Sequence, residues 1–125
     1  MKDWSDIKTK EQLKKRYASY LPSLMKIANR CGYALSLHGS MTRDLDLIAA
    51  PWVKNAMAPE SLVITLEKSL LGYSRMRSYW KNHGDRDSKP HGRRAYIIPF
   101  AILADDFEVK NWRMGIIDLS VMPRK

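Results

Sequence analysis

The chain contains one cysteine and no long run of apolar residues, and each scarcity excludes a class of protein. With Cys31 alone, an internal disulfide framework and a cysteine-rich zinc site are excluded. No stretch reaches the roughly 18 consecutive apolar residues typical of a membrane-spanning helix. The charged N-terminal sequence lacks the apolar core of a signal peptide. We therefore expect a soluble cytoplasmic protein with no membrane partner.

Several catalytic motifs are also missing from the sequence. It has no Gly-x-x-x-x-Gly-Lys phosphate loop and no Gly-x-Ser-x-Gly nucleophile elbow. Its three histidines lack the spacing of zinc ligands. These absences argue against P-loop enzymes, hydrolases with a serine elbow and histidine-based zinc enzymes.

Acidic residues are few relative to basic ones. The chain has 22 Lys and Arg against 13 Asp and Glu, for a net charge of +9. Such a surface attracts nucleic acid, nucleotides or acidic lipid headgroups. The same excess is also compatible with a role in solubility alone.

Hydrophobic periodicity and turn residues predict the order helix, strand, strand, helix, strand, strand. The predicted segments are a helical region over 1–32 that is divided at Pro22, strands over 33–38 and 44–50, a helix from Pro59 to about Gly72, and strands over 94–102 and 113–122. Pro99 argues for an edge position or a bulge. Residues 81–92 contain no apolar side chain, which predicts a mobile loop and a candidate lid. We expect one α/β (α+β) domain over 1–125, with helices on one face of a mixed or largely antiparallel sheet.

Three aspartates lie within the most apolar predicted strands, where aspartate is normally depleted. Asp44 and Asp46 are two residues apart, so they are expected on the same face of one strand. Asp118 alternates with Ile117 and Leu119 in the last strand. If the two strands are neighbours, all three carboxylates meet on the face that the helices leave uncovered.

Carboxylates brought this close repel one another unless a cation lies among them. Oxygen ligands suit Mg²⁺ or Mn²⁺, so Asp44, Asp46 and Asp118 are predicted metal ligands and catalytic residues. The alternative is that the aspartates form ordinary ion pairs with Arg43 or Arg113.

The segment from His38 to Leu47, HGSMTRDLDL, resembles the signature of the DNA polymerase β superfamily of nucleotidyltransferases. In that superfamily a Gly-Ser pair precedes an Asp-x-Asp pair, and a later strand supplies a third acid. Only three residues separate Ser40 from Asp44, whereas the superfamily usually has a longer segment there. HGSMTRDLDLIAAPW, KPHGRR and IDLSVMPR are together similar to small nucleotidyltransferase-like proteins of bacteria and their phages, which implies a host-cytoplasm location for a phage-encoded chain.

The resemblance implies a mixed sheet, two-metal chemistry on a nucleoside triphosphate, and phosphate contacts from Gly39 and Ser40. Arginine guanidinium groups suit phosphate oxygens, so further candidates for binding the nucleotide are Arg43, Arg93 and Arg94. His38 and His91 are candidates for phosphate contact or proton transfer. Of the four tryptophans Trp4, Trp52, Trp80 and Trp112, Trp52 is the best placed to stack a base, although core packing is the commoner role of such residues.

The leading hypothesis is a metal-dependent nucleotidyltransferase that moves a nucleoside monophosphate from a nucleoside triphosphate to a hydroxyl of RNA, DNA or a protein. The alternative is a catalytically inactive module of the same fold that binds nucleic acid or a partner protein. A toxin or phage factor that modifies host tRNA or protein would be one role for the first activity.

Overall fold

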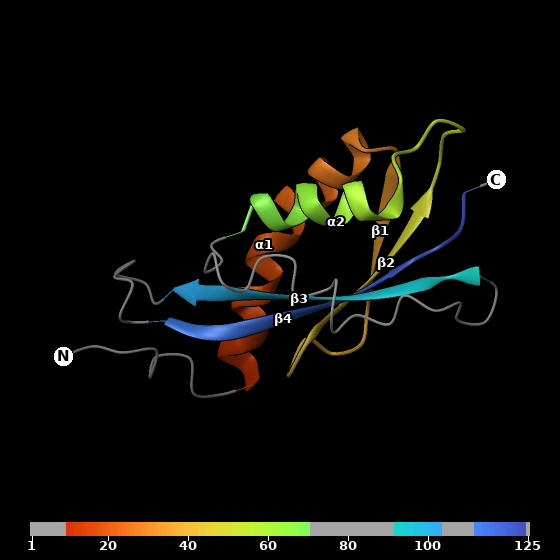
Figure 1. The fold of residues 1–125 in the computed structure, drawn as a ribbon. Coiled ribbons are helices and arrows are strands. Elements are labelled where there is room, and N and C mark those ends of the chain that lie inside the picture. The colour runs from red at the N-terminus through yellow and green to blue at the C-terminus, as the bar shows by residue number, and fades with distance from the viewer. Residues whose placement is uncertain (1–9, 71–91, 104–111, 125) are drawn as a thin grey trace.

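A computed structural model describes residues 10–70, 92–103 and 112–124. Within these residues two helices pack against a four-stranded mixed sheet (Figure 1), which confirms the predicted α+β class. The elements in chain order are α1 (Lys10–Arg30), β1 (Tyr33–His38), β2 (Leu45–Pro51), α2 (Pro59–Lys68), β3 (Arg94–Leu103) and β4 (Trp112–Val121).

The strand order in the sheet is β1-β2-β4-β3, so β2 and β4 are the central pair. They run parallel, whereas β1 pairs with β2 and β3 pairs with β4 in antiparallel fashion. The parallel pairing brings together two strands that α2 and β3 separate in the chain. β3 is an edge strand, where the missing N–H of Pro99 is tolerated, as the sequence predicted.

The sheet has one apolar face, and both helices pack on it (Figure 1). Its buried side chains include Leu45, Leu47 and Ala49 in β2, Tyr96 and Ile98 in β3, and Ile117, Leu119 and Val121 in β4. The helices contribute Leu13, Tyr17, Leu24 and Ala28 from α1 and Leu62, Val63 and Leu66 from α2. Because strand side chains alternate, the aspartates of β2 and β4 are left on the opposite face.

The structure corrects the prediction that Pro22 divides the first helical region. α1 continues through Pro22, which is exposed, from Lys10 to Arg30. A proline inside a helix costs about 3 kcal/mol. Burial of Tyr17 before it and Leu24 after it offsets this cost, since a fully buried large apolar side chain contributes about 1.5–3 kcal/mol.

Other boundaries differ from the predicted ones by a few residues. β2 begins at Leu45, so Asp44 lies in the bend before the strand and not within it. α2 ends at Lys68, where Ser69 caps it, and not near Gly72. β4 begins and ends one residue earlier than predicted, and β3 ends one residue later.

Part of the prediction lies outside the described residues. This applies to the loop over 81–92, of which only Gly92 is described, and to His91, Trp4 and Trp80. Within residues 10–70, 92–103 and 112–124, neither helix has the length and apolar character needed to cross a bilayer.

Candidate functional site

Asp46 of β2 and Asp118 of β4 are direct partners in the parallel strand pair. Partners in adjacent strands point to the same face, and the strands lie about 4.8 Å apart. The condition set in the sequence analysis, that these two strands are neighbours in the sheet, is therefore met. His38 of β1 is the partner of Asp46 on its other side, so one row across the sheet reads His38, Asp46, Asp118.

This row borders a cavity of about 360 Å³ on the sheet face that the helices do not cover. The polar side chains in its wall are those of His38, Asp46, Arg93, Asp118 and Ser120. Arg93 donates a hydrogen bond from Nη1 to Ser120 Oγ, at 2.8 Å. Ser120 follows Asp118 on the same face of β4, so this contact holds a cationic group beside the carboxylates.

Asp44 lies in the bend that precedes β2 and is not among the residues that line this cavity. Burial raises the pKa of Asp46, and the charge of Asp44 adds to that rise. Tyr17 of α1 contacts this bend from the helix side of the sheet. Its hydroxyl donates a hydrogen bond to the Arg43 carbonyl at 2.8 Å. The same hydroxyl accepts from the Ile116 N–H at 3.1 Å. One buried side chain thus ties the backbone beside Asp44 to the start of the segment that carries Asp118.

The pKa of Asp46 is raised above its ordinary value. Burial is the main cause, and the neighbouring Asp44 carboxylate adds to it. Arg43 and His38 act in the opposite direction. The ionised form of Asp46 is therefore disfavoured in the protein alone and would be favoured by a bound cation.

The turn that enters β2 brings its backbone against the Asp46 carboxylate. Gly39 has φ of +72°, and a Cβ at this position would lie 2.8 Å from Asp46 Oδ2. Met41 also has a positive φ, of 60°, and its side chain is buried. Ser40 Oγ and Thr42 Oγ1 lie 2.8 Å apart in a hydrogen bond. The absence of a Cβ at Gly39 is thus what lets the turn pass so close to the acid.

The arginines predicted to bind nucleotide do not all lie together. Arg93 borders the aspartate cavity, and Arg43 lies close enough to lower the pKa of Asp46. Arg94 projects into a different cavity and contacts Glu60 of α2 at 3.4 Å. Residues 93 and 94 are adjacent, and successive side chains of an extended segment point to opposite faces.

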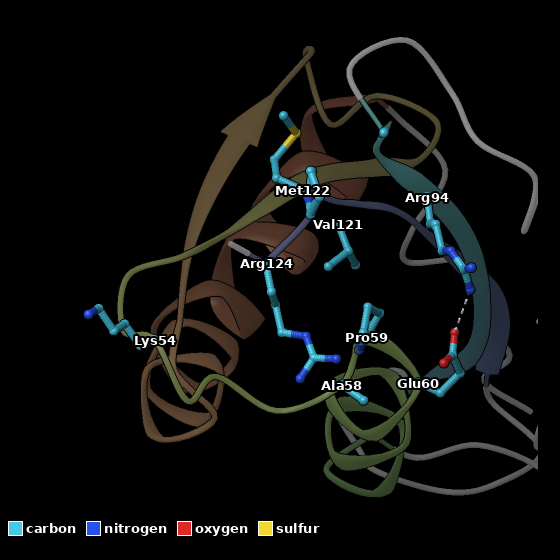
Figure 2. A pocket seen from close by; sticks show the side chains of 10 residues that line it. Lys54, Ala58, Pro59, Glu60, Arg94, Val121, Met122 and Arg124 are labelled. Atoms are coloured by element: carbon cyan, nitrogen blue, oxygen red, sulfur yellow. Dashed lines mark hydrogen bonds and ion pairs between the residues drawn. The ribbon is translucent and has the colours of Figure 1, made fainter.

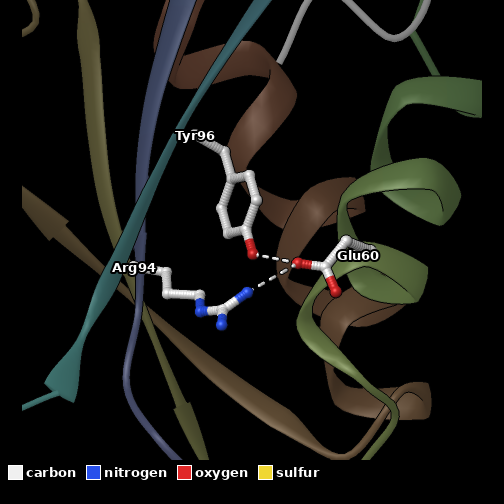
Figure 3. Close-up of polar contacts among 3 residues, drawn as sticks. All are labelled: Glu60, Arg94 and Tyr96. Carbon is white, nitrogen blue, oxygen red and sulfur yellow. Dashed lines mark hydrogen bonds and ion pairs between the residues drawn. The ribbon is translucent and has the colours of Figure 1, made fainter. Parts of the chain in front are cut away.

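Glu60 of α2 contacts two side chains of β3, Arg94 and Tyr96, and the sequence analysis predicted neither contact (Figure 3). Its Oε2 accepts hydrogen bonds from the Tyr96 hydroxyl at 2.5 Å and from Arg94 Nη1. Burial and the bond to Glu60 raise the pKa of Tyr96 to about 12. Tyr96 and Glu60 lie 36 residues apart, and nothing in either local sequence indicates the contact.

Among the described residues, the candidate metal donors are the two carboxylates Asp46 and Asp118 and not the predicted group of three. Within the part of the chain that is described, no three Asp, Glu, His or Cys side chains already form a ready metal cluster. Mg²⁺ commonly takes only one or two carboxylates from a protein, together with water and substrate phosphates. Asp46 and Asp118 supply two carboxylates on one face of adjacent strands, and Asp44 lies beside the first.

Some residues important for the geometry of the site were missed by the sequence analysis. Tyr17 was counted with neither the core nor the site, because its two partners lie 26 and 99 residues away. Arg93 and Arg94 are adjacent in an extended segment, so the sequence alone predicts that their side chains point to opposite faces.

Comparison with models of known protein families gives no match, and comparison with characterised proteins gives none either.

Proposed function

We propose that this protein is a metal-dependent nucleotidyltransferase whose site is the cavity that Asp46 and Asp118 border on the open face of the sheet. The observation that carries the proposal is the direct pairing of Asp46 with Asp118 on the sheet face left free by the helices. The pKa of Asp46, which burial and the Asp44 carboxylate raise, also supports the proposal, because perturbed pKa values are common at functional sites.

The aspartates, Arg93 and the turn before β2 have different roles in this reaction. Asp46 and Asp118 hold a divalent ion, and Asp44 adds negative charge beside them. Arg93 binds phosphate oxygens of the nucleoside triphosphate, since its guanidinium already faces the cavity. Gly39 and Ser40 approach the triphosphate from the turn before β2. This division leaves Arg94 outside the nucleotide site.

A Mg²⁺ or Mn²⁺ ion, when bound, supplies positive charge that neutralises the phosphates and stabilises the developing oxyanions. Asp118 accepts the proton of the acceptor hydroxyl. A bond forms between that oxygen and the α-phosphorus, and the bond from the α-phosphorus to the bridging oxygen breaks. Pyrophosphate leaves, and the nucleoside monophosphate remains on the acceptor.

The test is transfer of label from each α-labelled nucleoside triphosphate to RNA, DNA or protein in the presence of Mg²⁺ or Mn²⁺. We expect Asp46→Asn and Asp118→Asn each to lower the rate by about a hundredfold or more. Glu11→Gln, an exposed acid on α1, is the matched control and leaves the rate unchanged. Full incorporation by Asp46→Asn would overturn the proposal, and so would an inactive wild-type protein with every nucleotide and acceptor class.

A further inference from the structure

A second cavity, of about 520 Å³, lies at the end of the sheet where β2 and β4 finish (Figure 2). Its wall includes three cationic side chains: Lys54 from the loop after β2, Arg94 from β3 and Arg124 after β4. Among the described residues of this wall, the acid is Glu60. Three positive charges of the described wall therefore face one negative charge, which favours an anion.

The charges in this cavity are held in place and are not all neutralised by one another. Arg94 donates to Glu60 through Nη1, and that bond uses one of the five N–H groups of its guanidinium. Arg124 donates from Nη1 to the Ala56 carbonyl at 3.2 Å, which spends one of five N–H groups. Figure 2 shows Arg124 and Arg94 on either side of Pro59, with Lys54 extending outward at the rim. The first turn of α2 adds its positive end to the same space.

An apolar groove adjoins this cavity and shares three wall residues with it: Lys54, Met122 and Pro123. Trp52 lies in the groove and is 56% exposed, which is unusual for the largest apolar side chain. The side chain thus presents a flat ring to solvent within reach of a basic cavity. The basic cavity suits the phosphate of a nucleotide, and the exposed indole ring of Trp52 suits stacking of its base.

We propose that this end of the sheet binds single-stranded nucleic acid, with backbone phosphates at Lys54 and Arg124 and an unpaired base stacked on Trp52. The net charge of +9 complements such a polyanion. Base stacking on aromatic side chains and a basic groove along the backbone are the usual features of single-strand recognition. A duplex keeps its bases paired and unavailable to Trp52, and an acidic peptide has no regular planar group.

The proposed surface does not depend on the transfer reaction. No described residue borders both the aspartate cavity and this one, and Arg93 and Arg94 mark the division between the two. Binding of the strand therefore does not require Asp46 or Asp118. The two sites can fail or succeed independently.

The test measures the affinity of the full chain for short fluorescently labelled single-stranded RNA and DNA, by anisotropy over a series of salt concentrations. We expect Trp52→Leu to weaken binding about tenfold or more, because it removes the stacking surface. The double variant Lys54→Gln/Arg124→Gln also weakens binding. It lowers the slope of log affinity against log salt by about 1.4, as for two single-strand phosphate contacts.

Two controls separate this surface from general charge and from the aspartate site. Lys14→Gln/Lys15→Gln removes the same charge from the exposed side of α1 and has much less effect. Asp46→Asn binds the strand at least as tightly as the wild-type protein. Lys54→Gln alone gives half of the slope change, and it leaves intact the Arg124 contact that anchors the loop.

Any one of the following results would overturn the proposal. They are absence of binding at low salt, equal weakening by the two double variants, full binding by Trp52→Leu, and tighter binding to duplex, acidic peptide or anionic vesicles than to single strands. Loss of binding in Asp46→Asn would assign the strand to the aspartate cavity and overturn the proposal as well.

Discussion

At the scale of single residues, Gly39 sets how closely the turn approaches Asp46. We expect Gly39→Ala to lower the free energy of unfolding by about 1 kcal/mol or more, because alanine has no easy access to φ of +72°. The new methyl group would also meet Asp46 Oδ2 at 2.8 Å and displace the carboxylate. Urea unfolding and Mn²⁺ titration together measure both effects. An alanine variant with wild-type stability and metal affinity would contradict this account of the turn.

The ionised carboxylate of Asp46 is expected to lower the stability of the folded protein. Its pKa is raised in the folded protein, so its contribution to stability is fully present below its unfolded pKa and is lost as pH rises through the folded pKa. At neutral pH the ionised carboxylate therefore opposes folding. We expect Asp46→Asn to melt at a higher temperature than wild type at pH 7, and the difference to vanish in acid.

Thermal melts of both proteins between acid and neutral pH provide the measurement. Glu11→Gln on the exposed side of α1 is the matched control and shows no such pH-dependent gain. A lower melting temperature for Asp46→Asn at pH 7 would indicate a structural carboxylate that is stabilised by a partner.

At the scale of elements, α1 fixes the site through the hydroxyl of Tyr17. Tyr17→Phe keeps the ring, which lies 6.3 Å from that of Phe100, and removes both hydrogen bonds. We expect a loss of about 1–3 kcal/mol in the free energy of unfolding, because the Arg43 carbonyl and the Ile116 N–H lose their partner.

Tyr20→Phe is the matched control for this change. Tyr20 lies one turn further along α1 and contacts the same Phe100, at 5.3 Å between ring centroids. Its hydroxyl takes no part in the two hydrogen bonds that Tyr17 makes with Arg43 and Ile116. Denaturant unfolding compares the two variants. Equal losses in both would mean that the Tyr17 hydroxyl contributes nothing specific.

The contact between α2 and β3 gives a prediction in alkali. Because the pKa of Tyr96 is raised to about 12, its contribution is complete below pH 10 and is lost between about pH 10 and 12. We expect Tyr96→Phe to lower stability by about 1 kcal/mol at pH 7, through loss of the bond to Glu60. The variant also loses stability less steeply above pH 10 than wild type, although Tyr20 and Tyr33 still contribute there. Parallel alkaline profiles for the two proteins would contradict this.

The sequence predicted the faces of the strands better than their neighbours. Side chains alternate between the two faces of a strand. The alternation of apolar and polar residues in β2 and β4 therefore predicts which face carries Asp46 and Asp118. The pairing of β2 with β4 depends on the packing of the whole sheet. The sequence could therefore offer it only as a condition for the aspartates to meet. The Pro22 prediction was wrong because local propensity carries no information on what a helix buries on either side. Asp44, placed in the strand by its spacing, lies in a bend whose geometry depends on Tyr17.

At the scale of the whole molecule, the fold separates two chemically different surfaces. The face of the sheet away from the helices carries the aspartates, and the end of the sheet near α2 carries the basic cavity and Trp52. An excess of positive charge over the chain would bring a polyanion to the protein, while paired acids require a cation before phosphates can approach. This division explains why a protein of net charge +9 keeps acids adjacent on two central strands.

The central claim is that Asp46 and Asp118 jointly bind a divalent ion. Its most direct test is titration of the wild-type protein with Mn²⁺, in the presence and absence of a nucleoside triphosphate, with bound ion measured by electron paramagnetic resonance. We expect nucleotide to strengthen Mn²⁺ binding, and Asp46→Asn or Asp118→Asn to weaken it about tenfold or more. Equal Mn²⁺ affinity in the wild-type protein and both variants would contradict it.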